Sequence, residues 1–311
     1  MAAYESYRQR LVHQPSRQWD QDPTDVLIAD YNPKIPTFSV VMPIHNQEKI
    51  IQRVLSSVAD MTLGFYELIL ILDGCTDGTR ERVLEWVELL NVPTYLVRIH
   101  ILENPVGIFE TSCDNQGFIL SRGEYIVEVQ ADMAILTFGY NILLTSPLVQ
   151  YRDLIAISGR CCHGINKTPG GVHAGKLGEA VKEPHRILQD FDGFGKVILS
   201  HTVNRGPLVL RRSMLEELGF LDEAHYVLGD DEHDLFARAW IQKQWRCGFV
   251  PVEVYSPLEW GSTRKERAPE VQAYLEQREK NRSGGFLDQN REMIQYPPGE
   301  IRNYRIAGSL V

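Results

Sequence analysis

The sequence is short of the features that mark disulfide-stabilised and membrane-spanning proteins. Its 311 residues include five cysteines, and no two of them form a Cys-x-x-Cys pair. We therefore expect free thiols in a reducing compartment rather than a set of disulfides. The N-terminal segment lacks an apolar signal core, and no run of about 18 apolar residues occurs. These absences predict a cytoplasmic protein without a transmembrane segment, and they leave peripheral attachment to a membrane open.

Positive charge is also scarce. The chain has 32 Lys and Arg against 41 Asp and Glu, which gives a formal net charge of −9. Because the phosphates of a nucleic acid bind to a basic face, this balance argues against a nucleic acid as the main partner. The hydrophobic share of 43% and the charged share of 23% are those of an ordinary globular protein.

Three common nucleotide-binding and catalytic motifs are missing. The turn after the first apolar run has no glycine, so it is not the G-x-G-x-x-G turn of a dinucleotide-binding fold. Neither a G-x-x-x-x-G-K-[ST] loop nor a G-x-S-x-G turn occurs anywhere in the chain. Rossmann-type dehydrogenases, P-loop kinases and α/β-hydrolases are therefore disfavoured.

Short apolar runs alternate with segments that repeat apolar residues at helical spacing. Four runs predict strands, at 37–43, 66–74, 95–102 and 124–130, and three segments predict the helices between them, at 46–61, 76–90 and 104–123. This alternation is typical of an α/β fold with a mostly parallel central sheet flanked by helices. Right-handed crossovers then give the local strand order 3-2-1-4, with a topological switch between the first and fourth strands.

The rest of the chain divides by composition. We expect a polar N-terminal extension over 1–35, a single catalytic domain over 36–258 with its halves at 36–135 and 136–258, and a helical or irregular tail over 259–311. The remaining patterns predict a mobile loop or lid over 159–205, a strand and helix over 206–223, a helix and strand over 227–255, and a helix over 267–280. Within the loop, we interpret Cys161, Cys162 and His163 as loop residues, because adjacent ligands chelate a metal poorly.

Polar residues follow the first, second and fourth strands, at the edge of the sheet where ligands bind in such folds. Asp73 directly follows a buried run and is a candidate contact for a ribose or base, whereas Asp77 suits either a ligand contact or the N-cap of the next helix. Asp132 follows the fourth strand. A lone carboxylate can anchor a divalent cation beside a diphosphate, because phosphate oxygens and water complete the coordination.

A second group of carboxylates lies in the sequence Gly-Asp-Asp-Glu-His-Asp-Leu. Asp230, Asp231 and Glu232 stand at the predicted start of an amphipathic helix. They are expected either to cap that helix and complement its dipole, or to act as a general base, because carboxylates that crowd together raise one another's pKa.

Taken together, four segments resemble the family 2 glycosyltransferases, which have the Rossmann-like GT-A fold. The resemblance covers about 36–258 and rests on the order of these segments along the chain. They are FSVVMPIHNQEKIIQRVLSSV, ELILILDGCTDGT, NPVGIFETSCDNQGFILSRGEYIVEVQAD, and LRRSMLEELGFLDE followed by GDDEHDLFARAW. It implies a nucleotide-diphosphate sugar as donor and a glycan, a lipid-linked group or another hydroxyl compound as acceptor.

The resemblance also implies the site residues. The donor would contact Pro43, His45, Asn46, Glu48, Asp73, Asn115, Gln130, Ala131 and Asp132. Asp132 matches the second aspartate of the family's Asp-x-Asp metal motif and would hold Mn²⁺ or Mg²⁺. Two departures put strict metal dependence in doubt, because Gln130 replaces the first aspartate and Ser256 or Pro257 stands in place of a late histidine.

The resemblance implies catalysis by Asp231 or Glu232. One of them would deprotonate the acceptor hydroxyl in an inverting, single-step displacement, and the sequence alignment favours Asp231. A glycosyltransferase-like protein that binds a nucleotide or glycan without catalysis is an alternative, motivated by the altered metal positions. A nucleotidyltransferase is a more distant one.

Overall fold

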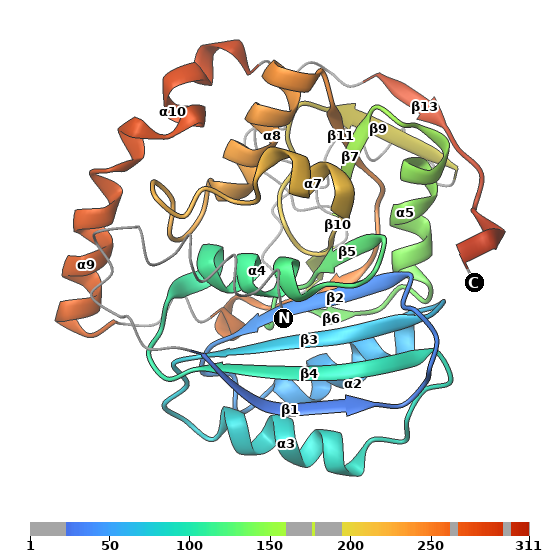
Figure 1. The fold of residues 1–311 in the computed structure, drawn as a ribbon, viewed down its shortest axis with the longest axis vertical. Coiled ribbons are helices and arrows are strands. Elements are labelled where there is room, and N and C mark those ends of the chain that lie inside the picture. The colour runs from blue at the N-terminus through green and yellow to red at the C-terminus, as the bar shows by residue number, and fades with distance from the viewer. Residues whose placement is uncertain (1–22, 160–175, 178–194, 262–266, 295–299, 311) are drawn as a thin grey trace.

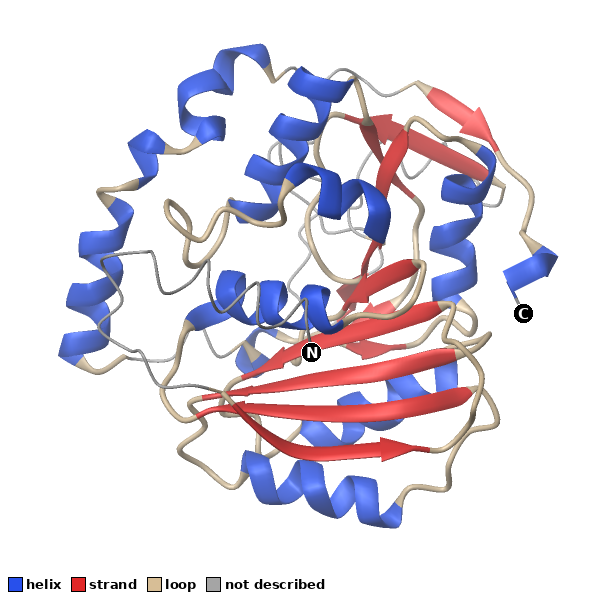
Figure 2. Cartoon of the chain, viewed as in Figure 1, coloured by secondary structure: helices blue, strands red, loops and turns tan. Residues whose placement is uncertain are grey.

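A computed structural model of the chain describes residues 23–159, 176–177, 195–261, 267–294 and 300–310. Its main sheet has ten strands in the order β1-β4-β3-β2-β5-β10-β7-β11-β9-β13 (Figures 1 and 2). These strands are β1 (Thr24–Asp30), β2 (Phe38–Ile44), β3 (Tyr66–Asp73), β4 (Leu96–Asn104), β5 (Tyr125–Glu128), β7 (Leu154–Ser158), β9 (Lys196–Ser200), β10 (Leu208–Arg211), β11 (Arg246–Phe249) and β13 (Ile301–Asn303). A second, small sheet joins β6 (Ala134–Ile135), β12 (Val254–Tyr255) and β8 (Lys176–Leu177).

The parallel half of the main sheet has the order β4-β3-β2-β5, which confirms the predicted order 3-2-1-4. Helices cover both of its faces, with α2 (Ile51–Met61) behind the sheet and α4 (Phe109–Leu120) in front of it in Figure 1. Successive residues of β2 therefore enter different cores, as Val40 packs in the cluster that contains Val54, and Val41 packs in the one that contains Cys113. Burial on both faces explains why these strands have continuous apolar sequences.

The second half of the sheet is mixed. β10 lies antiparallel to both β5 and β7, while β11 lies parallel to β7. The helices of this half of the fold are α7 (Arg212–Leu218), α8 (Asp231–Lys243) and α5 (Tyr140–Gln150), of which α5 packs near β7. The predicted strand and helix of 206–223, and the predicted helix and strand of 227–255, are confirmed.

Both edges of the sheet come from segments in which no strand was expected. β1 lies in the predicted N-terminal extension and pairs antiparallel with β4, and β13 lies in the predicted tail and pairs antiparallel with β9. The tail also holds α9 (Pro269–Glu279), where a helix was predicted, and α10 (Phe286–Asn290). β13 has only three residues, Ile-Arg-Asn, which is too short a run to predict a strand. β1 does contain an apolar run at 26–29, but this run lies in a polar segment that also contains prolines.

The expected loop over 159–205 is described only in part. Within it the structure contains β8 and the buried strand β9, which the composition did not predict. Cys161, Cys162 and His163 lie outside the described residues. Cys75, Cys113 and Cys247 are free thiols, as expected.

One glycine allows the loop after β3 to approach the loop before α4. Gly74 has a left-handed backbone with φ of +54°, and a Cβ atom placed there would lie 2.4 Å from the backbone nitrogen of Gly107. Real Cβ atoms do not approach backbone atoms so closely. The contact brings the carboxyl ends of β3 and β4 against each other at the edge where the candidate site lies.

We predict that Gly74→Ala lowers the free energy of unfolding by about 3–4 kcal/mol, through backbone strain together with overpacking. Gly219→Ala is the matched control, since Gly219 has a φ of +82° and a Cβ atom placed there would have no neighbour within 4 Å. It should cost only the strain of about 1–2 kcal/mol. Urea denaturation measures both. Equal losses in the two variants would show that the close approach is not important.

Candidate active site

The loops after β2 and β3 are joined by side-chain hydrogen bonds. His45 Nδ1 lies 2.6 Å from the backbone oxygen of Asp73. Asn46 has a left-handed φ of +50°, and its Oδ1 accepts a hydrogen bond from the Thr76 backbone at 2.8 Å, while its Nδ2 donates to Thr76 Oγ1 at 3.1 Å. These contacts bring together two of the three loops that the sequence assigned to the ligand site.

Asp73 is buried and anchors the start of α4. Its Oδ1 accepts a hydrogen bond from the Ile108 backbone at 2.8 Å, and its Oδ2 accepts one from the Phe109 backbone at 3.0 Å. Burial raises the pKa of Asp73 above its usual value, although both hydrogen bonds favour the ionised form. The carboxylate thus supports the loop before α4, and a direct contact with a nucleotide stays a prediction.

Asn115 also has a supporting position. It is 3% exposed, its Nδ2 donates to Glu223 Oε1 at 2.7 Å and to the Leu221 backbone oxygen at 3.0 Å, and its Oδ1 accepts from the Leu221 backbone at 3.0 Å. These bonds attach α4 to the segment that leads toward α8. The expected contact with the donor stays a prediction.

Asp77 supports the start of α3 (Thr79–Leu89) without being its N-cap, and a contact with a ligand stays a prediction. Its Oδ1 accepts a hydrogen bond at 3.0 Å from the backbone of Thr79, the first residue of α3. Its Oδ2 accepts one from the Glu48 backbone at 3.3 Å. Asp77 lies one residue before the N-cap Gly78, and its carboxylate therefore ties the start of α3 to the turn that carries Glu48.

Gln130, at the first position of the expected metal motif, has a carboxylate neighbour. Its Nε2 donates a hydrogen bond to Glu110 Oε1 at 3.1 Å. A carboxylate at position 130 could only accept hydrogen bonds and would repel Glu110. The amide is therefore suited to this environment, whereas Ala131 is buried and Asp132 is half-buried.

Asp132, which the sequence assigned to a divalent cation, stays a predicted ligand. In the small sheet Tyr255 pairs with Ala134, so the next residue, Ser256, follows in register with Met133, the neighbour of Asp132 in the chain. Ser256 is 1% exposed, and its buried hydroxyl has no hydrogen-bond partner among the described residues. A carboxylate and a hydroxyl offer two oxygen ligands, which is enough only if diphosphate oxygens complete the coordination.

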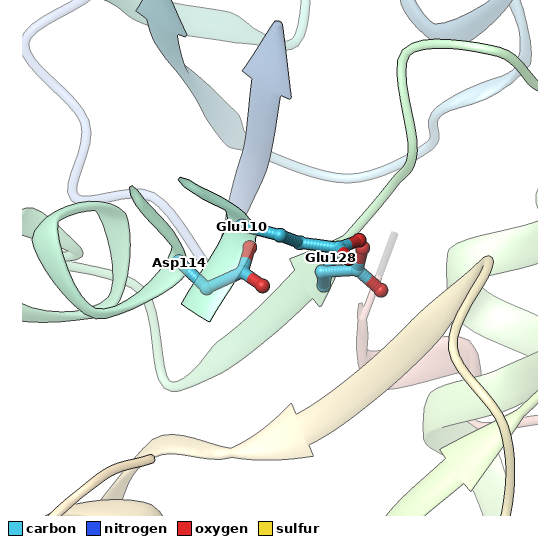
Figure 3. A group of neighbouring side chains, drawn as sticks. All are labelled: Glu110, Asp114 and Glu128. Atoms are coloured by element: carbon cyan, nitrogen blue, oxygen red, sulfur yellow. The ribbon is translucent and has the colours of Figure 1, made fainter. Parts of the chain in front are cut away.

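A larger group of carboxylates lies deeper, between α4 and β5. Figure 3 shows Glu110 and Asp114, from α4, directed toward Glu128 at the end of β5, and their ligand atoms lie within 4.8 Å of one another. Such a cluster could hold a metal ion. It already has a cation, however, because Arg205 Nη1 lies 3.2 Å from Glu110 Oε1 and contacts Asp114.

The same guanidinium reaches the start of α8. Arg205 Nη2 contacts Asp231, and its Nε lies 3.6 Å from Glu232 Oε2. Asp231 also accepts a hydrogen bond from Thr111 Oγ1 at 2.6 Å. Arg205 is 5% exposed, so four carboxyl groups and their shared counter-ion lie largely out of contact with water.

Burial and mutual repulsion separate the carboxyl groups of this cluster by their pKa. Burial opposes ionisation of Asp231, but Arg205 and Thr111 together hold the pKa of Asp231 below its usual value. Burial, with the charge of Asp231, raises the pKa of Glu232 well above its usual value in spite of Arg205. Burial raises the pKa of Asp114 in the same way. Asp231 is therefore the carboxyl of this group that stays ionised most readily.

Sequence reasoning located Asp231 and Glu232 but missed Arg205, Glu110 and Glu128. Arg205 lies in an irregular segment before β10 that contains no recognisable motif. Glu128 lies within the strand predicted at 124–130, most of whose residues are apolar. A sign of the cluster is present in α4, since Glu110 and Asp114 are four residues apart and so share one face of the helix.

The donor-side part of the chain matches a known family. Residues 39–137 match the family described as Glycosyl transferase family 2. A segment of 97 residues is 30% identical to the "Putative colanic acid biosynthesis glycosyl transferase WcaA" of Escherichia coli (strain K12), which is 31% of this chain and 33% of that protein. The match thus spans about one third of that relative.

Two solved structures share this fold. The mannosyltransferase PcManGT from Pyrobaculum calidifontis, in complex with GDP-Man and Mn²⁺, superposes with a TM-score of 0.52 at 16% identity, over 96% of this chain and 85% of that one. GalNAc-T7 with UDP, GalNAc and Mn²⁺ gives 0.53 at 16% identity, over 78% and 48%. These likenesses show the GT-A fold. Among the helices that the structure describes, none has both the length and the hydropathy of a membrane span.

We predict that Gln130→Glu lowers the free energy of unfolding by about 1–3 kcal/mol at neutral pH, because it replaces the donor to Glu110 by a second carboxylate. The penalty should shrink as the pH falls and the new carboxyl group becomes protonated. Gln130→Met, which removes the hydrogen bond without adding charge, is the control, and its loss should not depend on pH in this way. Urea denaturation at pH 7 and pH 5 compares them, and identical pH dependence would contradict the repulsion.

Proposed function

We propose that the chain, of which residues 39–137 match the family described as Glycosyl transferase family 2, transfers a sugar from a nucleotide-diphosphate donor to an acceptor hydroxyl group in the cytoplasm. The observation that carries this proposal is the position of Glu232. It stands at the N-terminus of α8, beside the Arg205 cluster, which also contacts the end of β5. A carboxyl group of raised pKa is thereby placed near the carboxyl ends of the parallel strands, where ligands of such sheets bind.

The donor occupies the loops after β2, β3 and β5. Both similar structures hold a nucleotide and Mn²⁺, which supports this donor class. Asp132 and Ser256 would hold a divalent cation, which when bound offsets the negative charge that develops on the leaving diphosphate. The amide of Gln130 and the side chains of His45 and Asn46 supply hydrogen bonds to the nucleotide or its phosphates.

Glu232 is the general base. It is 9% exposed, whereas Asp231 is fully buried and is held by Arg205 and Thr111. We therefore assign proton transfer to Glu232 and not to Asp231, which the sequence favoured. The carboxylate takes the proton of the acceptor hydroxyl, the acceptor oxygen forms a bond to the anomeric carbon, and the bond from that carbon to the diphosphate oxygen breaks. A displacement in one step inverts the configuration.

Asp231 and Arg205 position and tune this base. The negative charge of Asp231 raises the pKa of Glu232, while Arg205 lowers it. Glu232 must lose its proton before it can accept one from the acceptor. Burial makes the largest contribution to the raised pKa of Glu232, and the two neighbours adjust the pH at which the base becomes available.

We predict that Glu232→Gln lowers kcat about 10²–10⁴-fold, as expected for removal of a general base, with little change in donor affinity. In the native enzyme the acid limb of the pH–rate profile should lie above the usual glutamate pKa of about 4.3, because activity is lost when the pH falls through the raised pKa of Glu232. The measurement is steady-state release of nucleoside diphosphate. Full activity of Glu232→Gln would exclude this residue as the base.

Asp231→Asn provides the matched comparison. It removes the charge that raises the pKa of Glu232, so the acid limb should move to lower pH, whereas a purely structural role would lower the rate without moving the limb. Arg205→Met should move the limb in the opposite direction. The circular dichroism spectrum of each variant shows whether it is folded.

We further predict that the cation binds weakly until the nucleotide is present, because the fitting protein ligands are few. A thermal-shift panel of nucleoside diphosphates, with and without Mn²⁺, tests this, and a ligand at a hundredfold excess over its Kd should stabilise the fold by about 2–3 kcal/mol. Asp132→Asn should abolish the Mn²⁺-dependent part of the shift, and Ser256→Ala should reduce it. Tight Mn²⁺ binding to the nucleotide-free protein that survives in Asp132→Asn would place the ion elsewhere.

A further inference from the structure

The first turn of α4 connects the donor loops with the start of α8. The backbone N–H group of Phe109 donates a hydrogen bond at 3.0 Å to Oδ2 of Asp73, at the end of β3. Two residues later, Thr111 Oγ1 donates a hydrogen bond at 2.6 Å to Asp231. The position of this turn therefore affects the donor loops and the candidate base region at the same time.

Phe109 has a backbone conformation that is unusual for its residue type. Its φ is +68°, in the left-handed region. Asn46 also has a left-handed φ, but a short polar side chain tolerates this conformation far better than a bulky aromatic one. A conformation of this kind persists only where the surrounding contacts hold the residue in place. The hydrogen bond to Asp73 is one such contact, and the ring of Phe109 makes another.

The ring of Phe109 stacks on Tyr274 in α9. The ring centroids are 5.6 Å apart and the ring planes differ by 11°, which is the offset stacking that aromatic pairs favour. Most side chains of α9 are exposed, whereas Tyr274 is half-buried. Figure 1 shows α9 on the side of the molecule at which α4 begins. The stack thus joins a largely exposed C-terminal helix to a residue that binds Asp73.

Asp73 connects this contact to the loop after β2. Its side chain also accepts a hydrogen bond from the Ile108 backbone at 2.8 Å, and its backbone oxygen lies 2.6 Å from His45 Nδ1. A displacement of Phe109 would therefore reach both of the loops that are joined at the donor site. These loops are positioned in part by the residue on which Tyr274 stacks.

We propose that Tyr274 is a positioning residue for the nucleotide-diphosphate donor and that it acts through Phe109. The inference rests on the proposed transferase function. Tyr274 lies outside residues 39–137, which match the family, so a C-terminal helix supports a donor site that the matched segment forms. Because coupling between two binding equilibria is reciprocal, a bound nucleotide strengthens the attachment of α9 by the same factor by which that attachment strengthens nucleotide binding.

Isothermal titration of the full chain with ADP, CDP, GDP, UDP and dTDP, each with Mn²⁺, tests this role. Tyr274→Ala should weaken binding of the preferred nucleotide about 3–10-fold, as expected for loss of one aromatic pair. Tyr274→Phe keeps the ring and should bind as the native protein does. Gln277→Ala, at an exposed position of the same helix, is the matched control and should also keep the native affinity.

Steady-state transfer separates positioning of the donor from a part in the chemical step. In Tyr274→Ala the loss should appear in the donor KM and leave kcat unchanged, because the bound donor and the transition state are weakened alike. A lower kcat with an unchanged donor KM would contradict the assigned role. The circular dichroism spectrum shows whether the variant is folded.

A double-mutant cycle shows whether the effect passes through Phe109. Glycine adopts a positive φ without steric cost, so Phe109→Gly does not need an aromatic stack to hold its backbone. Adding Tyr274→Ala to Phe109→Gly should therefore leave the nucleotide Kd unchanged. A further loss as large as that of Tyr274→Ala alone would show that Tyr274 acts by another route, and would overturn the proposal.

Hydrogen exchange of the backbone amides gives a readout that needs no transfer. Peptides that cover 105–112 should exchange faster in Tyr274→Ala than in the native protein, since the amide groups bound to Asp73 lose support. In the native protein, the preferred nucleotide with Mn²⁺ should slow the exchange of α9. Tyr274→Phe should show the native pattern in both regions.

Unchanged affinity and exchange in Tyr274→Ala, or an equal loss in Tyr274→Phe, would overturn the proposal. Transfer that depends on Glu232 would then leave the proposed function intact without a role for Tyr274. A native protein that binds none of the nucleotides would instead overturn the proposed donor class, and the positioning role with it.

Discussion

The guanidinium group of Arg205 holds together the parts of the molecule that form the candidate site. It contacts carboxyl groups from α4 and from the start of α8, and through Glu110 it reaches the amide of Gln130 at the end of β5. A charge that is removed from water is costly unless it is well paired, so each partner depends on the others for its stability. The segment before β10 is thereby fixed against α4.

This arrangement gives a physical reason for the altered metal motif. The carboxyl groups around Arg205 outnumber its single charge, and the raised pKa values of Asp114 and Glu232 show that the cluster already favours bound protons. Another carboxylate at position 130 would increase the repulsion. An amide keeps the hydrogen bond to Glu110 without adding a negative charge.

Local patterns were enough to predict the parallel half of the fold. Strands buried on both faces have continuous apolar sequences, and the handedness of crossovers then fixes the order β4-β3-β2-β5. The carboxyl edge of the sheet followed from this order, as did the convergence of the loops at Asn46 and Asp73. The edge strand β13 was missed because a strand of three residues carries little signal, and β1 was missed because its apolar run lies in a polar segment that contains prolines.

The detailed roles of site residues could not be predicted, since they depend on contacts between distant segments. Asp73 lies 35 residues before Ile108, whose backbone it binds, and Arg205 lies 91 residues after Asp114. Neither contact can be predicted from the spacing of these residues along the chain. The choice between Asp231 and Glu232 similarly depends on which of them Arg205 and Thr111 enclose.

The two edge strands have a consequence for how the protein avoids association with itself. β1 and β13 cover strands β4 and β9, which would otherwise present unpaired backbone donors and acceptors along apolar, well-formed strands. Such open edges are templates for pairing with another chain and for the growth of aggregates. The segments outside 36–258 thus act as covers, and a chain trimmed to 36–258 would lose this protection against intermolecular sheet formation.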